Sequence, residues 1–95
     1  GFEQNYILIL RRNIMTITEI NSRDPEFRYQ LLARLEQDCK YFLGNGGRHP
    51  KYLWASTPEE HIEYMKGIWN GFPEEGKPEW LSWNDILKFQ GEMLD

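Results

Sequence analysis

Residues 38–54 read DCKYFLGNGGRHPKYLW, and this stretch decides how the chain folds. Its first third continues a helical pattern, and Gly44 is placed to close that helix in the left-handed conformation. The glycine-rich residues 44–47 allow a tight reversal, and His49-Pro50 resists helix at the histidine. Residues 52–54 are then expected to form one helical turn, or an extended piece, against the core. The stretch therefore predicts a helix leading in and helices packing back.

Helix signals lie on both sides of this stretch. Asp24-Pro25 pairs an N-cap with a proline at the first helical position, which predicts a helix from Pro25 to Leu43. Thr57-Pro58 repeats the signal for a second helix that stops at Asn70-Gly71. Ser82 and Asp85 form a capping-box pair that starts a third helix. The predicted fold is all-α: a small three-helix bundle with a short extra helical turn.

Apolar spacing assigns the inner faces of these helices. For the third helix, the expected inner face is Ile86, Leu87, Gln90, Met93 and Leu94, with Phe89 near its edge. Gly67 weakens the second helix by about 1 kcal/mol relative to alanine, which a close helix contact would explain. Residues 16–23 are expected to form a loop or an extended lead-in. The expected structural residues are Asp38, Cys39, Trp54, Trp69 and Trp80.

Residues 1–14 differ in character from the rest, and a single helical domain is expected over residues 15–95. Tyr6–Leu10 (YILIL) has strand character, and Arg11-Arg12-Asn13 can be encoded by a purine-rich ribosome-binding sequence before Met15. Residues 1–14 are therefore interpreted as a translated leader or an added extension. The alternative is a short edge strand that pairs two copies of the chain through residues 6–10.

Composition narrows the classes of function. Residues 1–50 carry seven Lys/Arg against six Asp/Glu, and residues 51–95 carry four against nine. This distribution disfavours a general nucleic-acid binder and suits an acidic surface that meets a basic protein. A single cysteine excludes an internal disulfide and fits the reducing cytoplasm. The sequence contains no apolar run long enough to cross a membrane.

The glycine turn is the first candidate site. Backbone N–H groups at such a turn can cradle an anion, but the turn lacks the lysine and hydroxyl of a P-loop. We expect instead that Arg48 pairs with Asp38, which lies on the buried side of the first helix and needs a partner. Cys39 is interpreted as a small buried hydrophobe. Cys39, His49 and His61 do not show zinc-ligand spacing, and neither a metal nor a cofactor is expected.

The same residues carry a family resemblance. The combined pattern D-C-x-Y-x-L-G-x-G-x-R and K-x-L-W-A, with Trp69 and the run Lys77–Leu81, resembles the eleventh large polyvalent protein-associated domain of phages and conjugative elements. The resemblance covers about residues 28–93, and Ser82-Trp83-Asn84 departs from the usual T-M-E. It implies an accessory module of mobile DNA with no agreed catalytic activity.

Two classes of function follow. The first is a non-catalytic protein-interaction module that counters or docks a host protein, binding through the turn and the acidic second half together. Its expected binding residues are Asn45, Gly46, Gly47, Arg48, His49, Lys51, Glu74, Glu75 and Glu79. The second is a small enzyme, or an anion- or nucleic-acid-binding domain, that uses the GNGGRH turn. A catalytic Cys39 would have to be accessible and electropositive, which its leucine-rich face disfavours.

Overall fold

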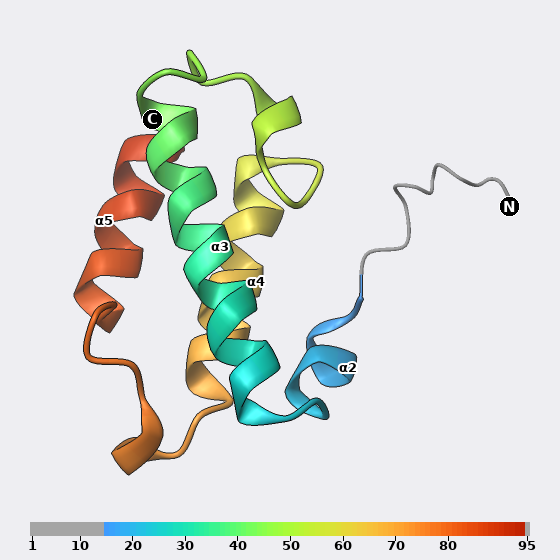
Figure 1. Cartoon of the computed structure of the whole chain (residues 1–95). Coiled ribbons are helices and arrows are strands. Elements are labelled where there is room, and N and C mark those ends of the chain that lie inside the picture. Colours follow the sequence, from blue (N-terminus) through green and yellow to red (C-terminus); the bar gives the residue numbers. More distant parts are fainter. Residues whose placement is uncertain (1–14, 95) are drawn as a thin grey trace, which may run out of the picture.

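Residues 15–94 are described in a computed structural model of the chain, and they contain helices and turns without any strand (Figure 1). The elements are α2 (Ile17–Asn21), α3 (Pro25–Leu43), the 3₁₀ turn η1 (Pro50–Tyr52), α4 (Pro58–Asn70), the 3₁₀ turn η2 (Glu74–Gly76) and α5 (Trp83–Met93). The all-α prediction is confirmed. The suggested strand at residues 6–10 and the leader at residues 1–14 fall outside the described residues.

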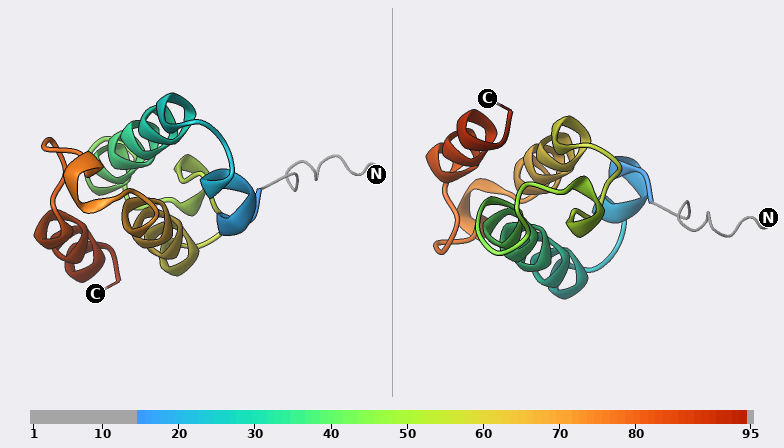
Figure 2. Two further views of the ribbon diagram at one scale, coloured as in Figure 1. Left: turned by 90° about the horizontal axis from the view of Figure 1, so that it is seen from below. Right: turned by 90° about the horizontal axis from the view of Figure 1, so that it is seen from above.

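Three of the helices form the predicted bundle. The end views in Figure 2 show α3, α4 and α5 at the corners of a triangle, and each contacts the other two. The short helix α2 lies on the side of α4 away from α5. The core between them is the cluster of Ile20, Leu32, Leu35, Cys39, Phe42, Leu53, Ile62, Met65, Ile68, Phe72, Leu81, Ile86 and Met93.

The boundaries of α3 and α4 agree with the predicted ones because both helices start at local caps. The Asp24 carboxylate accepts a hydrogen bond from the Phe27 amide at 2.8 Å, and the Thr57 hydroxyl accepts one from the Glu60 amide at 3.1 Å. Each cap satisfies an amide that has no partner inside its helix. A proline follows each cap at the first helical position.

The expected loop at residues 16–23 is wrong, because this segment contains α2. Thr16 and Glu19 form a complete capping box, with the Glu19 amide 3.1 Å from the threonine hydroxyl and the Thr16 amide 2.8 Å from the glutamate carboxylate. Ile20 is fully buried in the core. A five-residue helix has too few apolar positions to show a period, and it is stable here because Ile20 is buried in the core and α2 contacts α4.

Gly67 of α4 and Gly71, which caps the C-terminal end of that helix, provide the surface on which α2 rests. A Cβ at Gly67 would lie 2.7 Å from Cδ1 of Ile17, and one at Gly71 would lie 2.5 Å from Nδ2 of Asn21. The side-chain Nδ2 of Asn21 also donates to the Gly67 carbonyl at 3.2 Å. The close contact predicted from Gly67 is therefore real, and the partner is the helix that the sequence pattern did not reveal.

The predicted inner face of α5 is rotated relative to the observed one. Ile86 and Met93 are buried and Phe89 is half-buried, whereas Leu87 and Leu94 are 41% and 37% exposed. The apolar residues of this helix spread over more than one face, so their spacing permits two orientations. Packing between α3 and α4 selects the face of Ile86, Phe89 and Met93.

His61 joins three parts of the fold. Its imidazole is fully buried, with Nε2 2.9 Å from the Leu35 carbonyl and Nδ1 accepting from the Trp54 amide at 3.3 Å. One ring nitrogen therefore donates and the other accepts, which is the neutral Nε2–H tautomer. Burial lowers the pKa of His61, only partly opposed by the hydrogen bond to Leu35. The ring ties α3, α4 and the segment between them in its uncharged form.

The contact between α2 and α4 predicts an unusual response to Gly67→Ala. Alanine favours helix by about 1 kcal/mol over glycine, so an exposed site would gain stability. Here the new methyl group overlaps Ile17, and we expect a net loss of about 1–3 kcal/mol in urea denaturation. Repeating the substitution in an Ile17→Ala background should remove the loss. A stabilised Gly67→Ala single variant would show that α2 does not pack against Gly67.

The buried neutral imidazole predicts loss of stability in acid. Because the pKa of His61 is lower in the folded state, the unfolded chain binds more protons below its ordinary pKa of about 6.5. The free energy of unfolding should therefore fall as the pH drops from 7.5 through 6.5 to 5. Burial raises the pKa of Asp38, an effect of opposite sign that cannot produce this trend.

Two histidine variants separate this effect from general acid sensitivity. His61→Gln should cost about 1–3 kcal/mol at pH 7.5, because it leaves a buried backbone group without its partner, and its stability should change less between pH 7.5 and 5. The exposed His49 is the matched control, and His49→Gln should keep the full acid loss. Equal pH profiles for the wild type and His61→Gln would contradict the assignment.

Candidate functional site

The left-handed conformation predicted at Gly44 occurs three residues later, at Gly47. Gly44 caps α3 but has φ −106°, outside the left-handed region, whereas Gly47 and Arg48 both have φ 62°. Gly46 is buried, and a Cβ there would lie 2.8 Å from the Tyr41 carbonyl oxygen. A positive φ is uncommon for a residue with a side chain. The conformation of Arg48 therefore requires compensation from its contacts.

Five backbone amides of this turn donate hydrogen bonds within the fold. Gly44, Gly46 and Gly47 donate to the carbonyls of Lys40, Tyr41 and Gly44 at 3.0, 2.6 and 3.2 Å. The Arg48 amide donates to Phe42 at 2.7 Å and the His49 amide to Gly46 at 3.2 Å. An anion cradle requires free N–H groups pointing toward one place. These five amides are therefore not free to form an anion cradle in the GNGGRH turn.

Arg48 caps a helix instead of pairing with Asp38. Its Nη2 donates to the carbonyls of Glu92 and Met93 at 2.8 and 3.1 Å, at the C-terminal end of α5. A cation is favourable there because the last carbonyls of a helix lack partners and carry partial negative charge. Asp38 forms an ion pair with Arg34, with Nε and Oδ2 3.9 Å apart. The predicted contact between Asp38 and Arg48 is wrong because each residue has another partner.

Cys39 is a core residue, as predicted. Its thiol is fully buried, with Sγ 3.4 Å from the Met65 sulfur. Burial, followed by the negative charges of Asp38 and Glu36, raises the pKa of the thiol to about 12. A nucleophilic cysteine needs a lowered pKa and access to solvent, and Cys39 has neither.

The exposed side chains of the turn pack on one another. Tyr41 and Tyr52 meet edge to face with ring centroids 4.8 Å apart, and His49 lies 6.2 Å from Tyr52. The His49 Nδ1 accepts from the Lys51 amide at 3.3 Å and caps η1. Asn45 is exposed. These residues stiffen the reversal, and His49 is not brought to Cys39.

Within residues 15–94, no group of three or more His, Cys, Asp or Glu side chains is placed to hold a metal ion. None of the helices in that part of the chain has both the length and the apolar character needed to cross a bilayer.

The acidic candidates lie at the other end of the bundle. Glu74, Glu75 and Glu79 are exposed in the α4–α5 connection, which Figure 1 places at the bottom, opposite the turn at residues 44–49. The antiparallel course of α3 and α4 separates the two sets by the length of a helix. The expected single surface containing both the turn and the acidic residues is therefore split into two ends.

The tryptophans named as structural residues differ in how far they are buried. Trp54 and Trp69 pack against the core, Trp54 edge to face with Tyr64 at 5.0 Å and Trp69 with its indole N–H 2.9 Å from the Leu81 carbonyl. Their structural assignment is confirmed. Trp80 is 44% exposed and lies outside the core cluster, so its assignment as a structural residue stays a prediction.

Internal contacts hold the α4–α5 connection on the bundle. The Tyr29 hydroxyl donates to the Gly76 carbonyl, and Lys77 Nζ donates to the Phe72 carbonyl while lying 4.8 Å from the centre of the Trp69 ring. Pro78 is buried. The connection presents its glutamates from a defined backbone, although it contains only one 3₁₀ turn.

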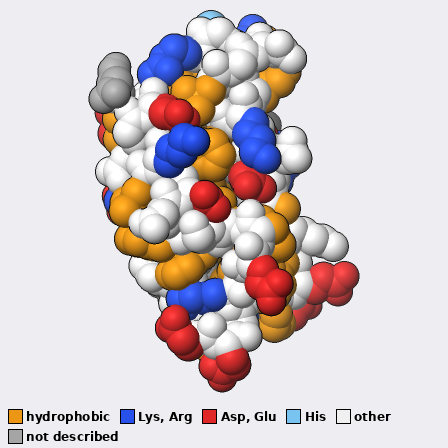
Figure 3. Space-filling view, turned by 90° about the vertical axis from the view of Figure 1, so that its left-hand side faces the viewer, with side chains coloured by type: hydrophobic (Ala, Val, Ile, Leu, Met, Phe, Trp, Pro, Cys, Tyr) orange, Lys and Arg blue, Asp and Glu red, His pale blue; other side chains and the backbone are white. Residues whose placement is uncertain are grey.

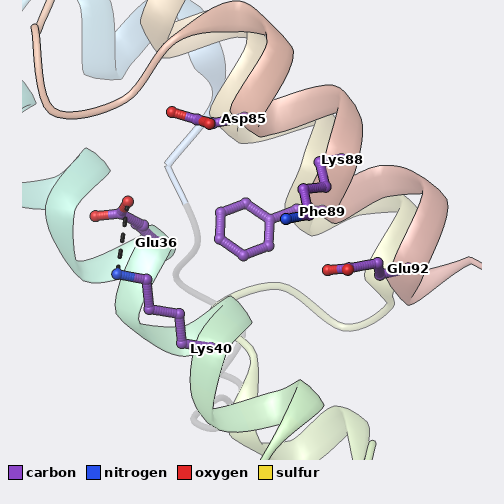
Figure 4. A pocket seen from close by; sticks show the side chains of 6 residues that line it. All are labelled: Glu36, Lys40, Asp85, Lys88, Phe89 and Glu92. Atoms are coloured by element: carbon purple, nitrogen blue, oxygen red, sulfur yellow. Dashed lines mark ion pairs between the residues drawn. The ribbon is translucent and has the colours of Figure 1, made fainter.

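A groove between α3 and α5 was not expected from the sequence. It has a volume of about 350 Å³ and is lined by Glu36, Lys40, Asp85, Lys88, Phe89 and Glu92 (Figure 4). Glu36 and Lys40 form an ion pair at 3.8 Å. Figure 3 shows charged side chains of both signs around apolar surface on this face. The i, i+4 spacing of Glu36 with Lys40, and of Lys88 with Glu92, is visible in the sequence. That these two pairs line one groove depends on how α5 is rotated.

The new partner of Arg48 predicts independent effects for two substitutions. Arg48→Gln should destabilise the domain by about 1 kcal/mol, because it removes the cap of α5. Asp38 shares no hydrogen bond or ion pair with that cap, so Asp38→Asn and Arg48→Gln should add within about 0.5 kcal/mol in a double-mutant cycle. A coupling energy above about 1 kcal/mol would show that the two residues share a network after all.

Comparison with known proteins agrees with the resemblance noted from the motifs. No curated protein and no solved structure shows significant similarity to the chain. Residues 25–93 match the family described as large polyvalent protein-associated domain 11. The matched region begins at the first residue of α3 and ends at the last residue of α5. The chain therefore belongs to the large polyvalent protein-associated domain 11 family.

Proposed function

We propose that this domain is a non-catalytic protein-interaction module of a mobile genetic element, and that it binds a basic protein of the host or of the element. Such binding would either counter that partner or dock the element's protein to it. The proposed place of action is the host cytoplasm, which suits a chain whose single cysteine cannot form an internal disulfide.

The observation that carries this proposal is the acidic α4–α5 connection. Glu74, Glu75 and Glu79 are exposed on a segment whose backbone is held by Tyr29 and Lys77. A fixed patch of one charge sign attracts a partner of the other sign and speeds its encounter. The net charge of −4 acts in the same direction.

The proposal of a non-catalytic role rests on the burial and hydrogen bonds of the cysteine, histidine and arginine side chains considered as catalytic groups. The thiol of Cys39 has a pKa of about 12 in the core, and the buried His61 has both ring nitrogens occupied. His49 caps η1 and Arg48 caps α5. No nucleophile, base and orienting group converge among these residues, which an active site would require. The acidic surface equally disfavours nucleic acid, whose phosphates it would repel.

Affinity capture with the full chain tests the proposal. Tagged protein should retain a host or element protein with a basic surface, and replacing Glu74, Glu75 and Glu79 by lysine should weaken the interaction of the purified pair. Binding should also weaken as salt rises, because exposed charges are screened over about 8 Å at physiological ionic strength.

Glu63→Lys is the matched control. This residue is exposed on α4 and outside the connection, so the substitution changes the net charge as Glu75→Lys does while leaving the proposed surface intact. Circular dichroism should show that both variants are folded. Equal loss of binding for Glu63→Lys and Glu75→Lys, or unchanged binding for the triple variant, would reject the acidic connection as the binding surface.

A further inference from the structure

Trp80 stands apart from the other tryptophans. Trp54, Trp69 and Trp83 are half-buried against the core, whereas Trp80 is 44% exposed beside Glu79 in the α4–α5 connection. Tryptophan presents a large apolar face, and a soluble domain gains little by leaving that face in water. Tryptophan is among the residue types enriched where a few side chains supply most of the binding energy of a protein interface.

A series of aromatic contacts supports this indole from the core outward. The buried Phe72 ring stacks on Tyr29 with centroids 4.4 Å apart, and Tyr29 lies 6.5 Å from Trp80 at a tilt of 56°. The buried Pro78 and the hydrogen bond from the Tyr29 hydroxyl to Gly76 hold the backbone before it. Ordering of this surface is therefore largely achieved in the free protein, which lowers the entropic cost of binding.

The exposed charges of the connection that carries Trp80 favour a cation. Glu74, Glu75 and Glu79 are exposed, and the positive charge within this connection, Lys77, is directed toward the Phe72 carbonyl and the Trp69 ring. The opposite end of the bundle offers a different surface, in which Tyr52 lies beside Lys51 at 5.2 Å. The connection therefore combines an exposed indole with three exposed glutamates, and the turn does not.

We propose that Trp80 and the glutamates of the connection form a docking surface for an arginine-bearing segment of a partner protein. A guanidinium group would lie flat on the indole while its N–H groups donate to the carboxylates of Glu79 or Glu75. Arginine suits this surface better than lysine, because its planar group stacks on an aromatic face and is less strongly hydrated. This inference rests on the proposed function and specifies the residue and the chemistry that carry it.

Titration of the full chain with two synthetic peptides tests the inference. One peptide alternates glycine and arginine, and the other replaces each arginine with lysine at equal length and charge. In ¹H–¹⁵N spectra, the arginine peptide should shift the Trp80 indole N–H and the amides of residues 74–80 in a saturable way. The Trp54, Trp69 and Trp83 indoles are internal controls and should move little. The lysine peptide should bind more weakly by roughly two- to fivefold.

Substitutions at Trp80 and at the glutamates test where the arginine peptide binds. Trp80→Ala should weaken the arginine peptide by roughly five- to tenfold, and Trp80→Phe should weaken it less, because indole is the better ring for a cation. Glu74→Gln with Glu75→Gln should weaken binding, whereas Glu59→Gln with Glu63→Gln, an equal charge change on exposed positions of α4, should not. Trp80 is exposed, so these variants are expected to fold, and circular dichroism checks this.

Three contrary outcomes would reject the docking surface, its proposed occupant or the role of Trp80, respectively. If Trp80→Ala and wild type bind the arginine peptide equally, or if both glutamine pairs act alike, the docking surface is rejected. A Trp80 indole signal that shifts with protein concentration alone, together with a rising mass in light scattering, would identify a second copy of the chain as the occupant instead. If the captured partner depends on Glu74, Glu75 and Glu79 but not on Trp80 or on its own arginines, the proposed function survives and this inference fails.

Discussion

The buried imidazole of His61 is the polar contact on which the fold depends. Among the described residues, it is the single polar or charged side chain in the core. Its Nδ1 accepts a hydrogen bond from the Trp54 amide, and its Nε2 donates one to the Leu35 carbonyl. Without it, the Trp54 amide beside the core would lose its hydrogen-bond partner, at a cost comparable to a large fraction of a small domain's stability. The segment after η1 is thus held against α3, and Leu53 and Ala55 on either side of Trp54 are buried as a result.

A second polar contact closes the same end of the bundle. Arg48 adopts a positive φ that costs a residue with a side chain of order 1 kcal/mol or more, and its guanidinium caps the last carbonyls of α5. The hydrogen bonds to α5 and the stacking over Phe42, 5.6 Å from the ring centre, offset that strain. The conspicuous GNGGRH motif therefore has a structural explanation: it joins the end of α3 to the end of α5.

The two ends of the bundle consequently differ in what they leave exposed. At the turn, amides, arginine and histidine are used within the fold, and the exposed tyrosines pack on each other. At the α4–α5 connection, the backbone is held from within by Tyr29 and Lys77, so the glutamates and Trp80 remain directed to solvent. A surface that is ordered yet unsatisfied is better suited to binding than one whose groups are already paired. This contrast is the reason for placing the interaction surface at the connection.

Local chemistry determined what the sequence by itself could show. The starts of α3 and α4 follow from Asp24-Pro25 and Thr57-Pro58, because a cap and its first turn lie within four residues of each other. The buried Cys39 and the family membership likewise follow from nearby residues and motif spacing. Gly67 showed that a close contact was needed, but its partner was hidden, since Ile17 lies fifty residues earlier in the chain.

Tertiary structure decided the remainder. The rotation of α5, which exposes Leu87 and forms the groove at Phe89, depends on how two other helices pack, and its own spacing fits more than one face. Arg48 found its acceptors on Glu92 and Met93 because the bundle brings the end of α5 beside the turn. The separation of that turn from the acidic connection follows from the antiparallel course of the helices. Contacts between residues more than forty positions apart leave no local pattern, and only the folded chain could reveal them.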